Sequence, residues 1–151
     1  MSNITWHCQA FNDLSLIDFH NLVQLRINVF VVEQNCPYPE LDDKDPKTFH
    51  VFGKQDNKVV AVARLLANGI SYDEWSIGRV ATHIDFRKQK LGHALMEYCH
   101  QQIELLAGKV PIRISAQEYL QQFYEAHGYK KVSEMYLEDD IPHIEMLREI
   151  T

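Results

Sequence analysis

Residues 77–94 read IGRVATHIDFRKQKLGHA, and this stretch combines the features that decide the fold. Its first six residues predict a strand, the basic segment before Gly92 predicts a loop, and the apolar pattern after Gly92 predicts a helix. A helix N-terminus carries unpaired N–H groups and about half a positive charge, so phosphates bind there readily. Arg87, Lys88 and Lys90 add cations, and Gly92 lets a ligand approach the backbone. The alternative is an ordinary solvated basic loop, because a single glycine is a weak motif.

Outward from this stretch, the apolar periodicity predicts further strands and two further helices. Strands are expected over Ile4–Ala10, His50–Lys54, Lys58–Leu66, Trp75–Thr82, Val110–Ala116, Tyr129–Leu137 and His143–Ile150. Helices are expected after a cap at Asp13 or Ser15, over Gly92–Leu106 and over Leu120–His127. This order indicates an α+β fold with αβα layers, in which a mostly antiparallel central sheet of about 6–7 strands carries helices on both faces.

Composition limits the class of protein. The chain has 151 residues, 46% of them hydrophobic, and a net charge of −6. This length suits a single domain over residues 1–151. The negative charge argues against nucleic acid and anionic membranes as partners. No apolar run approaches the ~20 residues of a membrane span, and the first residues lack a signal-peptide pattern.

The cysteines and histidines suggest neither disulfides nor a metal site. Cys8, Cys36 and Cys99 are an odd number at wide spacing, which favours a reducing cytoplasm over a disulfide framework. The histidines show no metal-ligand spacing with these cysteines, so no metal is expected.

Two blocks resemble motifs of the Gcn5-related N-acetyltransferases, the GNAT family. In the pyrophosphate-binding motif, Arg or Gln is followed by x-x-Gly-x-Gly/Ala; Arg87 and Gly92 match it. Lys90 stands where the first glycine is usual, and a lysine is not expected to reproduce that glycine's freedom at positive φ. The second block, Phe123-Tyr124 followed by Gly128, is similar to a later motif of the same family. By itself such a Phe-Tyr pair is more often core packing.

The resemblance extends to the ElaA-like branch of this family. Residues 25–38, 77–80 and 141–144 are similar to that branch, so the resemblance covers nearly the whole chain. It implies that acetyl-CoA is the co-substrate and that the enzyme transfers the acetyl group directly to an amine. The acceptor is expected to be a small-molecule or peptide amine, and the sequence does not identify it. A non-catalytic CoA-binding regulatory module on the same fold and an acyltransferase with a longer acyl donor are the alternatives.

The resemblance also implies where the cofactor lies. The pantetheine arm is expected between two splayed strands, 77–82 and 110–116, where a backbone N–H would polarise the thioester carbonyl. The implied cofactor-binding residues are Val80, Ala81, Thr82, Arg87, Lys88, Gln89, Lys90, Leu91, Gly92, His93, Gln117, Phe123 and Tyr124.

Tyr124 fits the family position of the general acid that protonates the leaving sulfur. Glu33 is the candidate general base, provided that its surroundings raise its pKa. The alternative for Glu33 is an ion pair with Arg26 or a lysine. Three histidines are further candidate bases because imidazole titrates near neutral pH: His50, His83 and His143.

Two arginines interrupt apolar strands that are expected to be neighbours. A buried arginine needs a partner. Arg64 and Arg79 are therefore expected either to pair with an acidic residue, such as Asp42, Asp45 or Glu33, or to bind a carboxylate of the acceptor. The candidate acceptor-binding residues are Arg26, Arg64, Arg79 and His143. The sequence does not decide the oligomeric state, and a homodimer is the default expectation because it is the commonest assembly.

Overall fold

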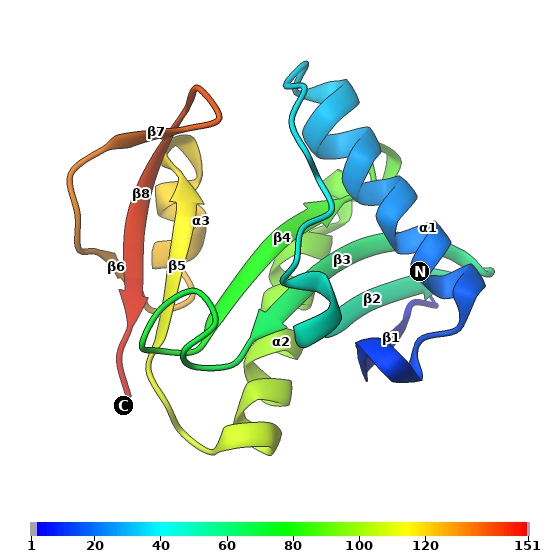
Figure 1. The fold of residues 1–151 in the computed structure, drawn as a ribbon, viewed down its shortest axis with the longest axis horizontal. Helices are drawn as coiled ribbons and strands as arrows, with labels where there is room; N and C mark the ends of the chain where they lie inside the picture. Colours follow the sequence, from blue (N-terminus) through cyan, green and yellow to red (C-terminus); the bar gives the residue numbers. More distant parts are fainter. Residues whose placement is uncertain (1–2, 151) are drawn as a thin grey trace.

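The computed structural model describes residues 3–150, apart from the side chains of Lys88 and Gln89. The described chain contains three α-helices and eight strands, in the order β1-α1-β2-β3-β4-α2-β5-α3-β6-β7-β8 (Figure 1). The helices are α1 (Leu16–Ile27), α2 (Leu91–Ala107) and α3 (Gln121–Glu125). The strands are β1 (Thr5–Ala10), β2 (Phe49–Gln55), β3 (Lys58–Leu66), β4 (Ser76–Thr82), β5 (Ile112–Gln117), β6 (Tyr129–Lys131), β7 (Tyr136–Glu138) and β8 (Ile141–Arg148).

The strands form two antiparallel sheets rather than the single central sheet that the sequence predicts. One sheet has the order β1-β2-β3-β4, and in the other β8 lies between β5 and β6 and also pairs with β7. Strands β4 and β5 are connected at one end, where Trp75 and Ile112 form a parallel bridge and the Arg113 N–H donates to the Trp75 carbonyl at 2.9 Å. Beyond this bridge the two strands diverge (Figure 1). The α+β class, the antiparallel pairing and the helices on both faces are confirmed.

An irregularity in β4 accompanies this divergence. Arg64 pairs with Gly78 and Val62 pairs with Ala81, so β4 contains one more residue than β3 over this interval. Arg79 has a left-handed backbone with φ of 51°. Such a bulge bends a strand and redirects its side chains. The bulge therefore leaves Arg79 and Val80 without register partners on β3, beside the opening between the sheets.

Helices α1 and α2 cover opposite faces of the first sheet (Figure 1). On the α1 face, Leu22 and Leu25 pack with Val62 of β3. On the α2 face, Leu95 and Cys99 belong to the larger core, which continues through β5 and β8. Because β3 is buried on both faces and lies between β2 and β4, its continuous apolar sequence is explained.

The ends of the helices follow local sequence signals. Of the two predicted caps, Ser15 is the one used: its Oγ accepts the Asp18 N–H at 3.1 Å. Gly108, with φ of 80°, follows the last turn of α2. All three cysteines are free. Within the described residues, no helix is long and apolar enough to cross a membrane.

Candidate functional site

A groove of about 800 Å³ lies between the diverging strands β4 and β5. Most residues predicted for cofactor binding line it: Val80, Ala81, Thr82, Arg87, Lys90, Gly92, His93, Gln117, Phe123 and Tyr124. Glu33, Arg64, Arg79 and His143 also line the groove. Leu91 does not, because its side chain is buried in the core with 3% exposure. The predicted roles of Lys88 and Gln89 concern side chains outside the described part of the chain.

One end of the groove is formed by the N-terminus of α2. Lys90 precedes this helix with φ of 57°, so it adopts the left-handed backbone that the sequence interpretation reserved for glycine. The first N–H groups of α2, from Leu91 to His93, have no earlier turn to donate to. A Cβ on Gly92 would lie 3.3 Å from the Phe123 ring, so the glycine allows α2 and α3 to approach closely. These features suit an anionic ligand.

Arg87 and Glu33 bind each other at this end of the groove. The guanidinium donates to both carboxylate oxygens, at 2.5 and 2.7 Å, and also to the Thr82 carbonyl. This bidentate hydrogen bond lowers the pKa of Glu33. The shift is opposite to the raised pKa that a base role was expected to require, and the partner is Arg87 rather than Arg26 or a lysine.

Tyr124 occupies the middle of the groove wall. Its side chain is buried, with 6% exposure, and its ring packs edge-on against Phe123 and Tyr129. Burial raises the pKa of Tyr124, so the phenol holds its proton at neutral pH.

Of the three histidines considered as bases, only His143 lines the groove. Its Nδ1 lies 2.7 Å from the Ile141 carbonyl oxygen, which can only accept, so Nδ1 carries the proton. Its Nε2 lies 3.7 Å from a Glu138 carboxylate oxygen. Ser115 donates to the other oxygen of Glu138 at 3.0 Å. This arrangement places an imidazole beside a carboxylate in the groove wall.

A buried network of alternating charges lies beneath the groove. Three arginines face three acidic residues, namely Arg26, Arg64 and Arg79 with Glu40, Asp42 and Asp45. Arg64 is held by both oxygens of Asp42, at 2.7 and 2.8 Å. Arg64 and Arg79 therefore form ion pairs, which is the first of the two alternatives. Of the three expected acidic partners, Asp42 and Asp45 take part and Glu33 does not. Arg26 is 1% exposed and absent from the groove wall, so it does not contact an acceptor there.

The segment from Glu33 to Cys36 connects to three elements on the far side of the groove. Glu33 pairs with Arg87, Gln34 accepts from the Gln117 amide at 3.3 Å, and the Cys36 thiol donates to the Asp139 carbonyl at 3.3 Å. We call residues 33–36 the strap. The strap therefore links the end of α1 to the α2 loop, to β5 and to the β7–β8 turn.

Sequence reasoning missed several residues on the groove wall, among them Tyr38, Lys44, Ser71, Tyr72 and Glu138. All except Glu138 lie in loops without a recognisable motif, and only folding brings them together. Glu40 was also missed as a partner of the arginines. The density of acidic residues over 40–45 was the available signal for it.

The comparisons with known proteins agree with this geometry. The family model described as "Acetyltransferase (GNAT) domain" matches residues 22–150. ElaA of Escherichia coli is 38% identical over 97% of each chain, and a UPF0039 protein of Schizosaccharomyces pombe is 40% identical over 99% of this chain and 100% of its own. The crystal structure of an acyl-CoA N-acyltransferase from Pseudomonas aeruginosa superimposes with a TM-score of 0.92 and 43% identity, covering 97% of this chain and 99% of that one. The chain therefore belongs to the GNAT acetyltransferase family, in its ElaA-like branch.

Proposed function

We propose that this protein transfers the acetyl group of acetyl-CoA directly to the nitrogen of an amine. The observation that carries the proposal is the continuity of the groove, which joins the N-terminus of α2 to Tyr124 and His143 between the diverging strands. A groove that holds donor and acceptor together supplies the proximity term, which is about 7–11 kcal/mol in ideal cases.

The residues fit a CoA thioester along this groove. The N–H groups that begin α2, together with Lys90 and Arg87, would bind the pyrophosphate. Gly92 keeps the approach to these N–H groups free of a side chain. The bulge leaves Arg79 and Val80 without partners on β3, which supports a backbone N–H near Val80 as the donor to the thioester oxygen.

Acetyl-CoA, when bound, supplies a carbonyl carbon that an amine can attack. The nitrogen–carbon bond forms as the carbon–sulfur bond breaks, and the products are an N-acetylated amine and the CoA thiol. Tyr124 gives its hydroxyl proton to the sulfur, and because its pKa is raised the phenol carries that proton at neutral pH. The proton lost by the amine passes to a base in the groove.

Two groups are candidates for this base. Glu33 would have to leave Arg87 first, and its pKa is lowered. His143 lines the groove, and its Nε2 lies beside Glu138 and makes no bond to an arginine. The geometry favours His143, and Glu33 is the second candidate. Replacing each by glutamine and recording rate against pH separates them, since loss of the base costs rate most at low pH.

The first experiment is a thermal shift with CoA, followed by an amine panel in which thiol release reports turnover. CoA should raise the melting temperature, because a ligand that binds only the folded state stabilises it. The panel is run with acetyl-CoA and with longer acyl-CoA thioesters, and faster turnover of a longer donor would replace acetyl in the proposal. A clear shift without turnover of any amine would favour the regulatory module. Absence of a shift at millimolar CoA would contradict both readings.

The compartment is part of this proposal. We place the enzyme in the reducing cytoplasm, which is consistent with its three free thiols.

A further inference from the structure

Resting on the proposed function, we propose that the acceptor is an amine that also carries a carboxylate, of the amino-acid type, and that Lys44 and Ser71 bind this carboxylate. Both residues line the groove at the loops that follow α1 and β3. The Lys44 ammonium donates to the Ser71 hydroxyl at 2.8 Å. Within residues 3–150, no carboxylate lies within ion-pair distance of this ammonium. The groove wall therefore holds a cation whose charge is not balanced by a paired anion.

The charges of the neighbouring arginines, unlike that of Lys44, are already balanced by carboxylates. In the buried network, three guanidinium groups are matched by three carboxylates, so Arg26, Arg64 and Arg79 are compensated. The network nevertheless holds the backbone at Lys44, because the Lys44 backbone N–H donates to Asp42 at 3.0 Å while Asp42 holds Arg64. The ammonium itself is held by Ser71, so an anionic ligand meets it beside a network without net charge.

A second donor belongs to Arg64, which also lines the groove. The Nε–H of Arg64 is buried and has no hydrogen-bond partner among the side chains and backbone described. It lies beside Gly78 in the groove floor, where an added Cβ would be 3.9 Å from Nε. A buried donor of this kind is normally satisfied. This unused donor gives the groove a further group that an oxygen acceptor of a ligand can satisfy.

The groove wall also carries a negative group. Glu138 lies there beside His143 and Ser115, with its side chain 47% exposed. A partly exposed carboxylate suits the amino group of an acceptor. A molecule carrying both an amine and a carboxylate has a partner of opposite charge for each group, whereas an amine without a carboxylate leaves Lys44 unused.

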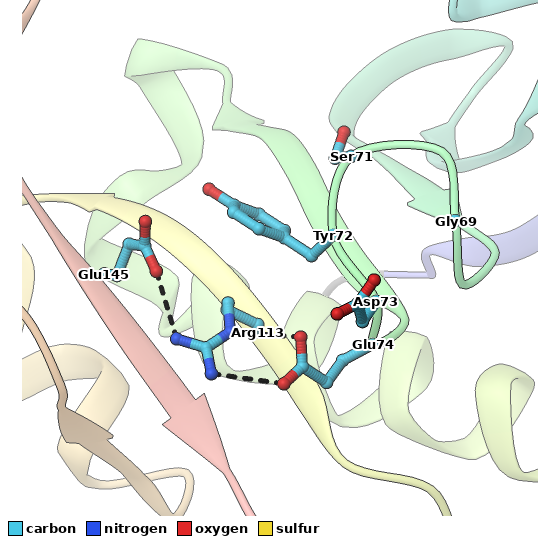
Figure 2. Close-up of a pocket in the computed structure, with 7 residues that line it drawn as sticks. All are labelled: Gly69, Ser71, Tyr72, Asp73, Glu74, Arg113 and Glu145. Atoms are coloured by element: carbon cyan, nitrogen blue, oxygen red, sulfur yellow. Dashed lines mark hydrogen bonds and ion pairs between the residues drawn. The ribbon is translucent and has the colours of Figure 1, made fainter.

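The outer side of the Ser71 loop offers no comparable site. An open hollow of about 440 Å³ lies there, lined by Asp73, Glu74, Arg113 and Glu145 as well as Ser71 and Tyr72. Figure 2 shows Arg113 bound between Glu74 and Glu145, with Ser71 and Tyr72 away from Glu74. Because the arginine is already occupied by two carboxylates, this hollow does not attract a further anion.

The test compares each L-amino acid of a panel with its own α-carboxamide, using acetyl-CoA as donor. In the wild-type protein, kcat/KM for the best amino acid should exceed that for its amide by about 10- to 100-fold, the usual range for a charge-assisted hydrogen bond. Lys44→Met should reduce this ratio to near one by lowering the rate with the amino acid. Lys44→Arg should recover part of it. Lys47→Met is the matched control, since Lys47 is exposed in the same loop and does not line the groove.

Calorimetry of amino-acid binding to the CoA-loaded protein makes the outcome independent of turnover. Amino-acid binding that weakens about 10-fold or more in Lys44→Met, and not in Lys47→Met, supports the subsite even if catalysis is absent. Equal rates for amino acids and amides, or turnover confined to peptide and protein amines, would overturn the inference and leave the acetyltransferase proposal standing. Turnover of no amine at all, with intact CoA binding, would instead count against the proposed function. Amino-acid binding that is absent, or unchanged in Lys44→Met, would then overturn the subsite as well.

Discussion

Lys90 and Arg79 are the two residues that show most directly how backbone strain is placed at this site. Both are non-glycine residues in the left-handed region, with φ of 57° and 51°. Such a conformation costs roughly 1–3 kcal/mol and persists only where the surroundings enforce it. Lys90 precedes the end of α2 that we propose binds phosphate, and Arg79 forms the bulge beside the opening. The strain is therefore located where the groove is shaped.

Substitutions of Lys90 separate the effect of backbone strain on stability from the effect of charge on CoA binding. Lys90→Gly should raise the free energy of unfolding by about 1 kcal/mol, because glycine adopts positive φ without a steric cost. It should also flatten the dependence of CoA affinity on salt, since an exposed cation is screened over ~10 Å at 0.1 M salt. Urea unfolding and CoA affinity at two ionic strengths measure the two effects. Lys90→Ala is the control that loses the charge and keeps the strained backbone, so equal stability of both variants would contradict the strain argument.

Tyr124 is the single residue on which the proposed chemistry depends most. Tyr124→Phe removes only the hydroxyl, so fold and CoA affinity should be retained while kcat falls by about 10²-fold. Steady-state kinetics with the identified acceptor provides the measurement. Tyr119→Phe is the matched control, because Tyr119 also lines the groove but is 74% exposed at its rim. A turnover number equal to that of the wild type would remove Tyr124 from the mechanism.

At the scale of elements, the strap connects the end of α1 to the opposite side of the groove through three different partners. The bond between Glu33 and Arg87 bears directly on CoA binding, because Arg87 is also the proposed pyrophosphate ligand. A carboxylate and a phosphate compete for the same planar guanidinium. Glu33 of the strap therefore competes with the pyrophosphate of CoA for the Arg87 guanidinium.

Glu33→Gln should strengthen CoA binding by about two- to fivefold, the size expected for release of a partly exposed ion pair. Calorimetry at low salt measures this gain, and added salt should reduce it. Glu74→Gln is the matched control, since Glu74 pairs with Arg113 outside the groove. Unchanged CoA affinity in Glu33→Gln would show that Arg87 does not exchange Glu33 for the pyrophosphate.

At the scale of the whole molecule, local signals predicted the elements better than their assembly. The period of apolar residues located α2, but the last apolar pair of the predicted range, Leu105 and Leu106, is exposed. The core position of that last turn is Ile103, four residues after Cys99. The stretch Tyr129–Leu137, predicted as one strand, forms β6 and β7, separated by residues 132–135.

Some of the site residues could be predicted from the sequence for the same reason. The α2 loop and the Phe123-Tyr124 block are continuous in sequence, so their motifs placed them on the groove wall. Lys44, Ser71 and Glu138 come from three separate loops and strands, and no local pattern connects them. The division into two sheets depends on the β4 bulge, where a non-glycine residue adopts positive φ, and sequence alone does not signal this.

The pH dependence of stability is a property of the whole fold. His100 is packed against Tyr129, with Nε2 at 2.9 Å from the phenol oxygen, and burial lowers the pKa of His100 from 6.5 to about 3. Below pH 6.5 the unfolded chain therefore binds more protons than the folded one, and stability falls as the pH falls. This histidine alone should cost up to about 2 kcal/mol between pH 7 and pH 5.

Urea unfolding at these two pH values provides the measurement. His100→Gln should lose less stability on acidification than the wild type, because the amide has no proton to gain. His20→Gln on α1 is the control, since His20 is exposed. Parallel pH profiles for wild type and His100→Gln would contradict the assignment.

The neutral network beneath the groove also constrains how descendants of this chain can change. Replacing one of its fully buried members, for example Glu40, leaves an opposite charge buried without compensation, a loss of about 3–5 kcal/mol. A typical domain has only about 5–15 kcal/mol of stability in total. Single substitutions at these positions are therefore strongly destabilising, and a tolerated change must replace both members of an ion pair. The Lys44 side chain lies in the same loop as Glu40, Asp42 and Asp45 but makes no ion pair with them, so position 44 can change without breaking the network.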